Sequence, residues 1–276
     1  MGEGRSRTFY VLSIVFGLYV LFLYGPTITI VALSFQGPNG GMTFPLNGVS
    51  LHWFDALISQ TRVGDIAGSF MRSIGLAAIV AVVTVVLSVL AGLAFRRRFR
   101  GSAFAFYLAI ASLIMPGLFV GLGIALTFRL LGLPTEWYTT ALGAQLTWTL
   151  PFGLLIMFAV LGRFNRSYEE AATDLGATNW QKVREVTLPI LLPGIIGVAL
   201  FGFTLSYDEI ARTALAAGAK NTLPLEIWAM TTNVTSPTLY AVGAVTTIVS
   251  FIVIVVALGS IALVQRRRAA AGMRTE

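Results

Sequence analysis

The chain has 276 residues, of which 56% are hydrophobic and only 11% are charged, whereas a soluble domain usually carries about a quarter charged residues. This composition excludes an ordinary soluble protein and indicates a chain that crosses a membrane several times. There is no cysteine and only one histidine, His52, so a disulfide framework, a thiol nucleophile and a cysteine metal site are excluded. The net charge of +7 comes from basic clusters beside apolar runs, which is typical of topology signals and not of nucleic-acid binding.

Six long apolar segments predict six transmembrane helices, because each exceeds the length of about 20 residues that a helix needs to cross the hydrocarbon core. In chain order they cover residues 9–35, 70–95, 103–131, 140–161, 190–219 and 239–264. Pro116 lies inside the third and Pro151 inside the fourth, where a kink could serve gating or only packing. The runs lack the alternation of a β-barrel. We therefore expect an all-α, polytopic membrane protein with a single transmembrane domain over residues 1–276.

The basic residues predict how the chain is oriented. With six spans, the clusters near residues 5–7, 96–100, 163–184 and 266–274 all fall on one side of the membrane. The positive-inside rule assigns that side to the cytoplasm, so both termini and the segment 163–189 are expected there. The first apolar segment could also be a signal peptide, but it is longer than the apolar region of about 7–15 residues in such peptides, and we expect an uncleaved span.

A polar cassette, residues 163–189, separates the fourth and fifth spans. A first helix is predicted from residues at helical spacing, namely Tyr168, Ala171, Ala172 and Leu175. Gly176 is expected to end this helix, because glycine readily adopts the left-handed conformation of a helix C-terminus.

A second, short helix is expected to follow. Thr178 and Gln181 have the spacing of a capping box, and Leu188-Pro189 is expected to end the helix because proline lacks an amide donor. The helix would present Trp180 among charged residues. Two roles stay open at this point: docking into a groove of another protein, or lying flat on the membrane with basic side chains toward anionic lipid.

The cassette resembles a known signature. Glu170-Ala171-Ala172, Gly176-Ala177 and Leu188-Pro189 are similar in type and spacing to the EAA motif of ABC importer permeases, and six spans with cytoplasmic termini resemble the type I importer permease fold. The resemblance implies that the loop is a coupling helix that docks on an ABC ATPase. The residues that it implies for this coupling are Glu169, Glu170, Ala171, Ala172, Asp174, Gly176, Ala177 and Trp180.

The same resemblance implies a non-catalytic permease subunit of the bacterial inner membrane that forms half of a solute pathway. Its implied partners are an ABC ATPase dimer, a second permease that forms a heterodimer with it, a periplasmic or extracellular solute-binding protein and membrane lipid. No cofactor is expected on this chain; ATP and Mg would be bound by the ATPase, and the sequence has no G-x-x-x-x-G-K-[ST] phosphate-binding loop.

Two adjacent acids, Asp208 and Glu209, lie toward the outer end of the fifth span, and ionisable residues in such positions usually have a function. Arg212 follows at helical distance from both and could neutralise them. The sequence therefore leaves open whether these acids meet a cationic solute or pair with the arginine.

The segment 203–210, followed by Thr222-Leu223-Pro224-Leu225, resembles the fifth-span region of spermidine/putrescine-type permeases. This implies a polyamine or a related cationic solute, with Tyr207, Asp208, Glu209 and Trp228 in the substrate pathway; aromatic faces suit ammonium groups.

Three alternatives remain at this stage. The chain could be a permease for another small solute such as an opine, or a secondary transporter that uses the two acids for ion coupling without an ATPase. It could also be a membrane enzyme or scaffold, although no acid in the sequence forms a recognisable catalytic pair with a base.

Overall fold

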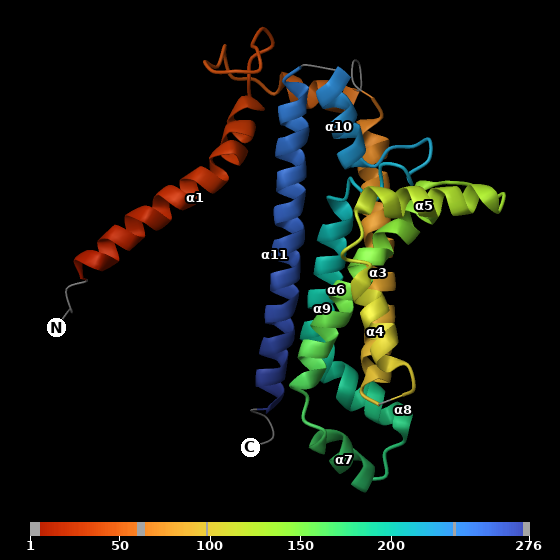
Figure 1. Ribbon diagram of the computed structural model, residues 1–276. Helices are drawn as coiled ribbons and strands as arrows, with labels where there is room; N and C mark the ends of the chain where they lie inside the picture. The colour runs from red at the N-terminus through yellow and green to blue at the C-terminus, as the bar shows by residue number, and fades with distance from the viewer. Residues whose placement is uncertain (1–5, 60–63, 98, 234–235, 273–276) are drawn as a thin grey trace. The chain divides into compact units, whose positions relative to one another are not determined.

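The computed structural model describes residues 6–59, 64–97, 99–233 and 236–272, and within them the chain is helical with no named strand (Figure 1). Five helices in this part of the chain are long and apolar enough to cross a membrane. They are α1 (Arg7–Leu33), α3 (Ile66–Phe95), the helix formed by η1 (Trp137–Ala141) and α6 (Leu142–Gly162), the helix Asn179–Tyr207, and α11 (Thr238–Gly272). The predicted all-α, multi-span architecture is confirmed. Arg5, Arg98 and Arg274, which the expected orientation uses, lie outside the described residues.

The chain folds as two compact units, residues 1–66 with 227–249 and residues 67–226 with 250–276. The first unit contains α1, α2 (His52–Ser59), the end of α10 (Leu223–Asn233) and the beginning of α11. Leu33 is the only buried residue of α1, so its apolar surface suits contact with lipid or another chain. The loop after α1 is held by the Gln36 side chain, whose Nε2 donates to the Gly41 carbonyl at 3.1 Å and whose Oε1 accepts from the Asn47 amide at 2.7 Å.

The core of the second unit is formed by α3, α6 and α9 (Leu188–Tyr207). Val89, Met157, Leu191 and Val198 are buried together, and the Thr84 hydroxyl donates to Thr149 Oγ1 at 2.9 Å. In a hydrocarbon environment close packing and interhelical hydrogen bonds hold helices together, because burial from water gives no driving force between them. The cassette between α6 and α9 and the two acids after α9 are both attached to this core.

The third predicted span is not one continuous helix, and that prediction is wrong. Residues 103–131 contain α4 (Ser102–Ala111) and α5 (Gly117–Leu130), and between them Pro116 has φ −58° and ψ 124°. The extended ψ of Pro116 interrupts the helix at this point, and proline favours such a break because it lacks an amide donor and disfavours helical geometry in the residue before it. Figure 1 shows α5 lying across the direction of α4. These two apolar helices of 10 and 14 residues take the place of the sixth long span.

The helix before the fifth span does not end at Leu188-Pro189, so that prediction is also wrong. α8 (Asn179–Gln181) and the π-helical turn η2 (Lys182–Thr187) continue directly into α9. In the wider π turn the Leu188 amide donates to the Val183 carbonyl, five residues back. Pro189 is the second residue of α9, and because proline lacks an amide donor, the continuous helix passes this residue without the backbone hydrogen bond that another residue would donate. The C-terminal end of the fifth span also differs from the prediction. The helix ends at Tyr207, whereas the predicted span covers residues 190–219.

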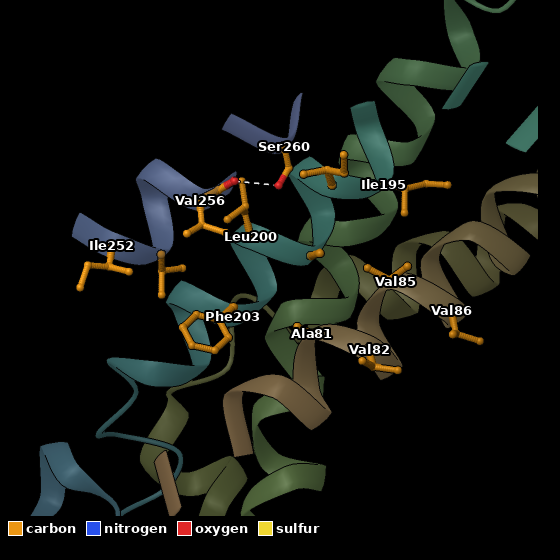
Figure 2. Close-up of a pocket in the computed structure, with 13 residues that line it drawn as sticks. Ala81, Val82, Val85, Val86, Ile195, Leu200, Phe203, Ile252, Val256 and Ser260 are labelled. Atoms are coloured by element: carbon orange, nitrogen blue, oxygen red, sulfur yellow. Dashed lines mark hydrogen bonds between the residues drawn. The ribbon is translucent and has the colours of Figure 1, made fainter. Parts of the chain in front are cut away.

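An apolar groove of about 580 Å³ runs along the second unit between α3, α9 and residues 252–260 of α11 (Figure 2). Val82, Leu200 and Phe203 are among its lining residues, and Ser260 is the only one with a polar side chain. The Ser260 hydroxyl donates to the Val256 carbonyl at 2.7 Å, as Figure 2 shows. The groove therefore offers no group that would hold a charged solute.

Candidate functional site

The cassette forms a helix, a tight turn and a second helix. α7 (Ser167–Asp174) ends at Leu175, and Gly176 has φ +83°. The Gly176 amide donates to the Thr173 carbonyl and the Ala177 amide to the Ala172 carbonyl, both at 2.9 Å. This pair of bonds is the Schellman motif, which satisfies the last carbonyls of a helix and favours glycine at the left-handed position. The predicted helix end at Gly176 is confirmed to within one residue.

The second helix begins with the predicted capping box. Thr178 Oγ1 accepts from the Gln181 amide at 3.3 Å, and Gln181 Oε1 accepts from the Thr178 amide at 2.8 Å. Each side chain therefore satisfies an amide that the first turn of a helix leaves free. Both ends of the turn 175–178 are closed by hydrogen bonds within the cassette itself, so the turn has a defined shape without a partner.

The apolar side chains on this turn point away from the rest of the second unit. Leu175 is 90% exposed and Trp180 is 67% exposed. Of the eight residues expected to couple to an ATPase, Glu170, Ala171, Asp174, Gly176 and Trp180 are exposed, and Glu169, Ala172 and Ala177 are partly buried. We define Leu175, Gly176 and Trp180 as the cassette tip; a rigid turn with exposed leucine and tryptophan is the kind of surface that another protein covers.

Glu169 faces inward and holds the cassette to two other elements. Its carboxylate accepts from Arg96 Nη1 at 2.7 Å and Nη2 at 2.8 Å, and from the Thr187 hydroxyl at 2.6 Å. The hydrogen bonds from Arg96 lower the pKa of Glu169 below its ordinary value of 4.5, with a smaller contribution from Thr187, and burial opposes this shift only in part. The bidentate contact with the guanidinium also fixes the orientation of the Glu169 carboxylate. The position of α7 is therefore fixed relative to the end of α3 and to η2.

Arg96 is a residue whose role the sequence did not reveal. It follows the last residue of α3, and its guanidinium also lies 5.0 Å from the centre of the Phe164 ring, within the range of a cation–π contact. In the sequence it counts only as the first member of a basic cluster. Arg96 directly follows the apolar run, whereas Arg97 and Arg100 come later in the chain. This position is the one signal in the sequence that distinguishes Arg96 from them.

The two acids after α9 have different environments. Glu209 is 6% exposed and Arg212 is 7% exposed, and Glu209 Oε2 lies 4.0 Å from Arg212 Nη1. Glu209 Oε1 also accepts from the Arg212 amide at 2.6 Å. The Arg212 guanidinium lies 4.9 Å from the centre of the Trp148 ring. The carboxylate and the guanidinium therefore compensate each other in a buried place where an unpaired charge would be costly.

Asp208, in contrast, is exposed, and no hydrogen bond or ion pair of its side chain is seen among the described residues. Tyr207 beside it is 8% exposed, and its ring stacks on Phe203 with centroids 6.0 Å apart. Trp228 is 61% exposed and belongs to the first unit, whereas Tyr207, Asp208 and Glu209 belong to the second. Of the four residues expected in a substrate pathway, the structure thus leaves the Asp208 carboxylate accessible at the end of α9.

The loop that carries these acids is anchored to α5 and α6. The Gln145 amide donates to Thr213 Oγ1 at 2.8 Å, and Ser206 donates to Gln145 Oε1. Gly121 lies against the Arg212 backbone, so that a Cβ added there would lie 2.2 Å from the Arg212 carbonyl oxygen. Gln145 and Gly121 are positioning residues that sequence patterns did not single out. In the described ranges no group of three potential metal ligands is present.

Comparison with known proteins decides the family. Residues 84–270, more than half of the chain, match the family described as "Binding-protein-dependent transport system inner membrane component". The chain belongs to this family. This permease is 30% identical over 215 residues to the putrescine transport system permease protein PotI of Escherichia coli K12, which covers 75% of each chain. It is 25% identical over 236 residues to the spermidine/putrescine transport system permease protein PotC of the same strain, covering 85% of this chain and 87% of the relative.

Solved structures show the same fold. A bacterial ABC transporter involved in the import of the acidic polysaccharide alginate aligns with a TM-score of 0.69 at 14% identity, covering 94% of this chain and 95% of the other. The MetNI methionine ABC transporter in an inward-facing form aligns with a TM-score of 0.59 at 17% identity, covering 78% of this chain and 99% of the other.

The predicted resemblance and fold class are therefore confirmed: the chain is a multi-pass inner-membrane permease of an ABC importer. Family membership also confirms that it is a non-catalytic subunit, and it excludes the membrane enzyme and the ion-coupled secondary transporter.

Proposed function

We propose that this permease forms half of the pathway of an ATP-driven importer for a polyamine or a related cationic solute. Permeases of spermidine and putrescine transport systems are among its relatives, and Asp208 offers an exposed carboxylate at the end of α9. A carboxylate attracts an ammonium cation by its opposite charge, and such a charge at a point of entry raises the local concentration of the solute. Glu209 supports the site indirectly, because its pairing with Arg212 holds the loop and leaves Asp208 as the accessible acid.

The cassette, residues 163–189, would couple the permease to an ABC ATPase, and in this role we call it the handle. The single observation that carries this proposal is the tip itself: Leu175 is 90% exposed on a turn closed at both ends by internal hydrogen bonds. Such a turn can transmit a displacement as a rigid element. Glu170, Ala171, Asp174 and Trp180 would contact the ATPase from their exposed positions. Glu169, Ala172 and Ala177, which are partly buried, would hold the handle in shape.

The rest of the assembly follows from this role. The permease would work as one transmembrane domain over residues 1–276, with both termini and the cassette in the cytoplasm. It would pair with a second, related permease in a heterodimer, and two ATPases would bind ATP and Mg. A soluble binding protein would deliver the solute to the opposite face, where Asp208, Tyr207 and Trp228 would lie near its path.

The handle is tested by copurification with the cognate ATPase. Leu175→Ser should weaken recovery of the ATPase by about tenfold or more, because it removes a large apolar contact from the centre of the interface. Leu130→Ser is a matched control, since Leu130 is 88% exposed but lies at the end of α5. Equal ATPase recovery with both variants would contradict the proposal.

The solute assignment is tested by uptake of labelled putrescine and spermidine. Asp208→Asn should lower uptake several-fold with the ATPase still bound, whereas Asp55→Asn, an exposed acid in α2 of the first unit, should leave uptake unchanged. Uptake that is the same in both variants would remove Asp208 from the pathway. Absence of polyamine uptake in the intact transporter would point instead to another small solute such as an opine.

A further inference from the structure

A second, polar cavity of about 580 Å³ lies where the end of α3 meets the cassette. Four basic side chains line it: Arg96, Arg97, Arg166 and Lys182. One acid, Glu169, is also present, and it is already engaged by both terminal nitrogens of Arg96. The cavity lies wholly within the second unit.

The other three cations have no carboxylate partner within the described residues. Lys182 Nζ donates to the neutral Thr173 hydroxyl at 3.0 Å, and Arg166 Nη2 lies 3.5 Å from the Arg96 carbonyl. Arg97 is exposed at the rim. The lining carries four cations and one carboxylate, which gives it a net charge of about +3. Guanidinium and ammonium groups that line the same cavity suit a phosphate group.

Part of the cavity lining, here called the apolar wall, carries no polar side chain. Leu93, Ala94 and Val183 form it, next to the last turn of α3. A helix of 30 residues is about 45 Å long, which matches the thickness of a bilayer including both headgroup layers. A helix of this length that crosses the bilayer along its normal brings its last turn, and the cavity beside it, to the level of the lipid phosphates.

We propose that this cavity binds the headgroup of an anionic phospholipid, with the phosphate held by Arg97, Arg166 and Lys182 and the glycerol backbone against the apolar wall. The combination of charge and apolar surface favours a lipid over a free phosphate ion, which would have no use for Leu93 and Val183. A bound lipid would connect α3 to the cassette beside the Arg96–Glu169 pair. This inference goes beyond the proposed function and does not depend on the identity of the solute.

The test is lipid retention by the purified full-length permease, measured by native mass spectrometry after exposure to mixed phosphatidylglycerol and phosphatidylethanolamine. The triple variant Arg97→Gln, Arg166→Gln, Lys182→Gln removes the cavity cations. Each basic residue near an anionic surface contributes roughly a fivefold preference, so phosphatidylglycerol should bind about 100-fold more weakly. The matched control is the triple variant Arg100→Gln, Arg163→Gln, Arg184→Gln, which removes the same charge from exposed positions outside the cavity and should change binding by less than about threefold.

Four results would overturn the proposal. Equal loss in both triple variants would mean a general attraction of the basic face to the membrane. Equal retention of the two lipids by the unmodified chain would remove the preference for an anion. Displacement of the lipid by millimolar inorganic phosphate would assign the cavity to a free ion. Unchanged lipid retention in the cavity triple together with lost ATPase recovery would make the cavity a protein contact. Should the triple variant not fold, Lys182→Gln alone should weaken binding about fivefold, and no change would be equally decisive.

Discussion

From the contact between Arg96 and Glu169 we predict how the local stability of α7 changes when Glu169 is substituted. Glu169→Gln keeps the shape of the side chain and one acceptor oxygen, but removes the charge and at least one of the three hydrogen bonds seen at 2.6–2.8 Å. Hydrogen bonds to charged groups contribute about 1.5–3 kcal/mol each. Exposed ion pairs contribute only about 0.2–1 kcal/mol.

The Glu169 side chain is 23% exposed and that of Arg96 17% exposed, so the loss should lie between these limits, near about 2 kcal/mol. This corresponds to a roughly 30-fold increase in the opening equilibrium of α7. Hydrogen exchange of the amides of residues 173–175 in the purified permease measures this opening directly. Amides in the centre of α6 should not change.

Glu170→Gln is the matched control for this experiment. It makes the same chemical change one residue further along the same helix, where the side chain is exposed and surface substitutions usually have little effect. The reasoning would be refuted if both variants accelerated exchange equally, or if neither did. Restoration of slow exchange by combining Arg96→Glu with Glu169→Arg would show that the pair itself, and not the glutamate alone, is responsible.

Three further predictions concern the same two sites. Gly176→Val should cost about 1–2 kcal/mol because of the positive φ alone, and should abolish the stimulation of ATPase activity by the loaded binding protein, whereas Gly176→Asn, which tolerates this backbone conformation, should retain it. Gly121→Ala should lower the midpoint of thermal unfolding, since its Cβ would lie 2.2 Å from the Arg212 carbonyl oxygen and overpacking costs about 1–3 kcal/mol; Gly123→Ala, with open space around it, should leave the midpoint unchanged. Because the pKa of Glu169 is lowered in the folded protein, the stabilisation that it provides is present above pH 4.5 and is lost as the pH falls through the lower folded value. Exchange in α7, corrected for its intrinsic pH dependence, should therefore stay constant from pH 7 to 5 and rise only below 4.5, and this rise should be absent in Glu169→Gln.

Local features of the cassette could be predicted from the sequence because they depend on neighbouring residues. The end of α7 near Gly176 follows from the preference of glycine for a positive φ, and the capping box of Thr178 and Gln181 depends on a spacing of three residues. Long apolar runs likewise reveal most of the spans, because their length and composition are what a bilayer requires.

The features that the sequence concealed depend on contacts between distant residues or on competing backbone geometries. The apolar run over residues 103–131 gives no sign that Pro116 divides it into two helices and does not merely kink one. The continuation through Pro189 requires a π turn, whose wider spacing does not appear in a pattern of apolar residues. The Arg96–Glu169 pair joins positions 73 residues apart, so no local pattern could have paired them.

The environments of Asp208 and Glu209 were undecided for the same reason. Two adjacent acids look equivalent in the sequence. The structure separates them because the turn after α9 directs Glu209 inward, toward Arg212, and leaves Asp208 exposed.

The central claim is that an ATPase binds the cassette tip. Because the chain contains no cysteine, this binding can be measured directly with a single introduced cysteine. A single cysteine introduced as Leu175→Cys can be labelled with a maleimide in the purified permease, before and after assembly with the ATPase, and compared with Asn39→Cys, an exposed position in the first unit. We expect assembly to protect the cysteine at position 175 almost completely while the one at position 39 stays reactive. Equal labelling of position 175 in the free and assembled states would contradict the account.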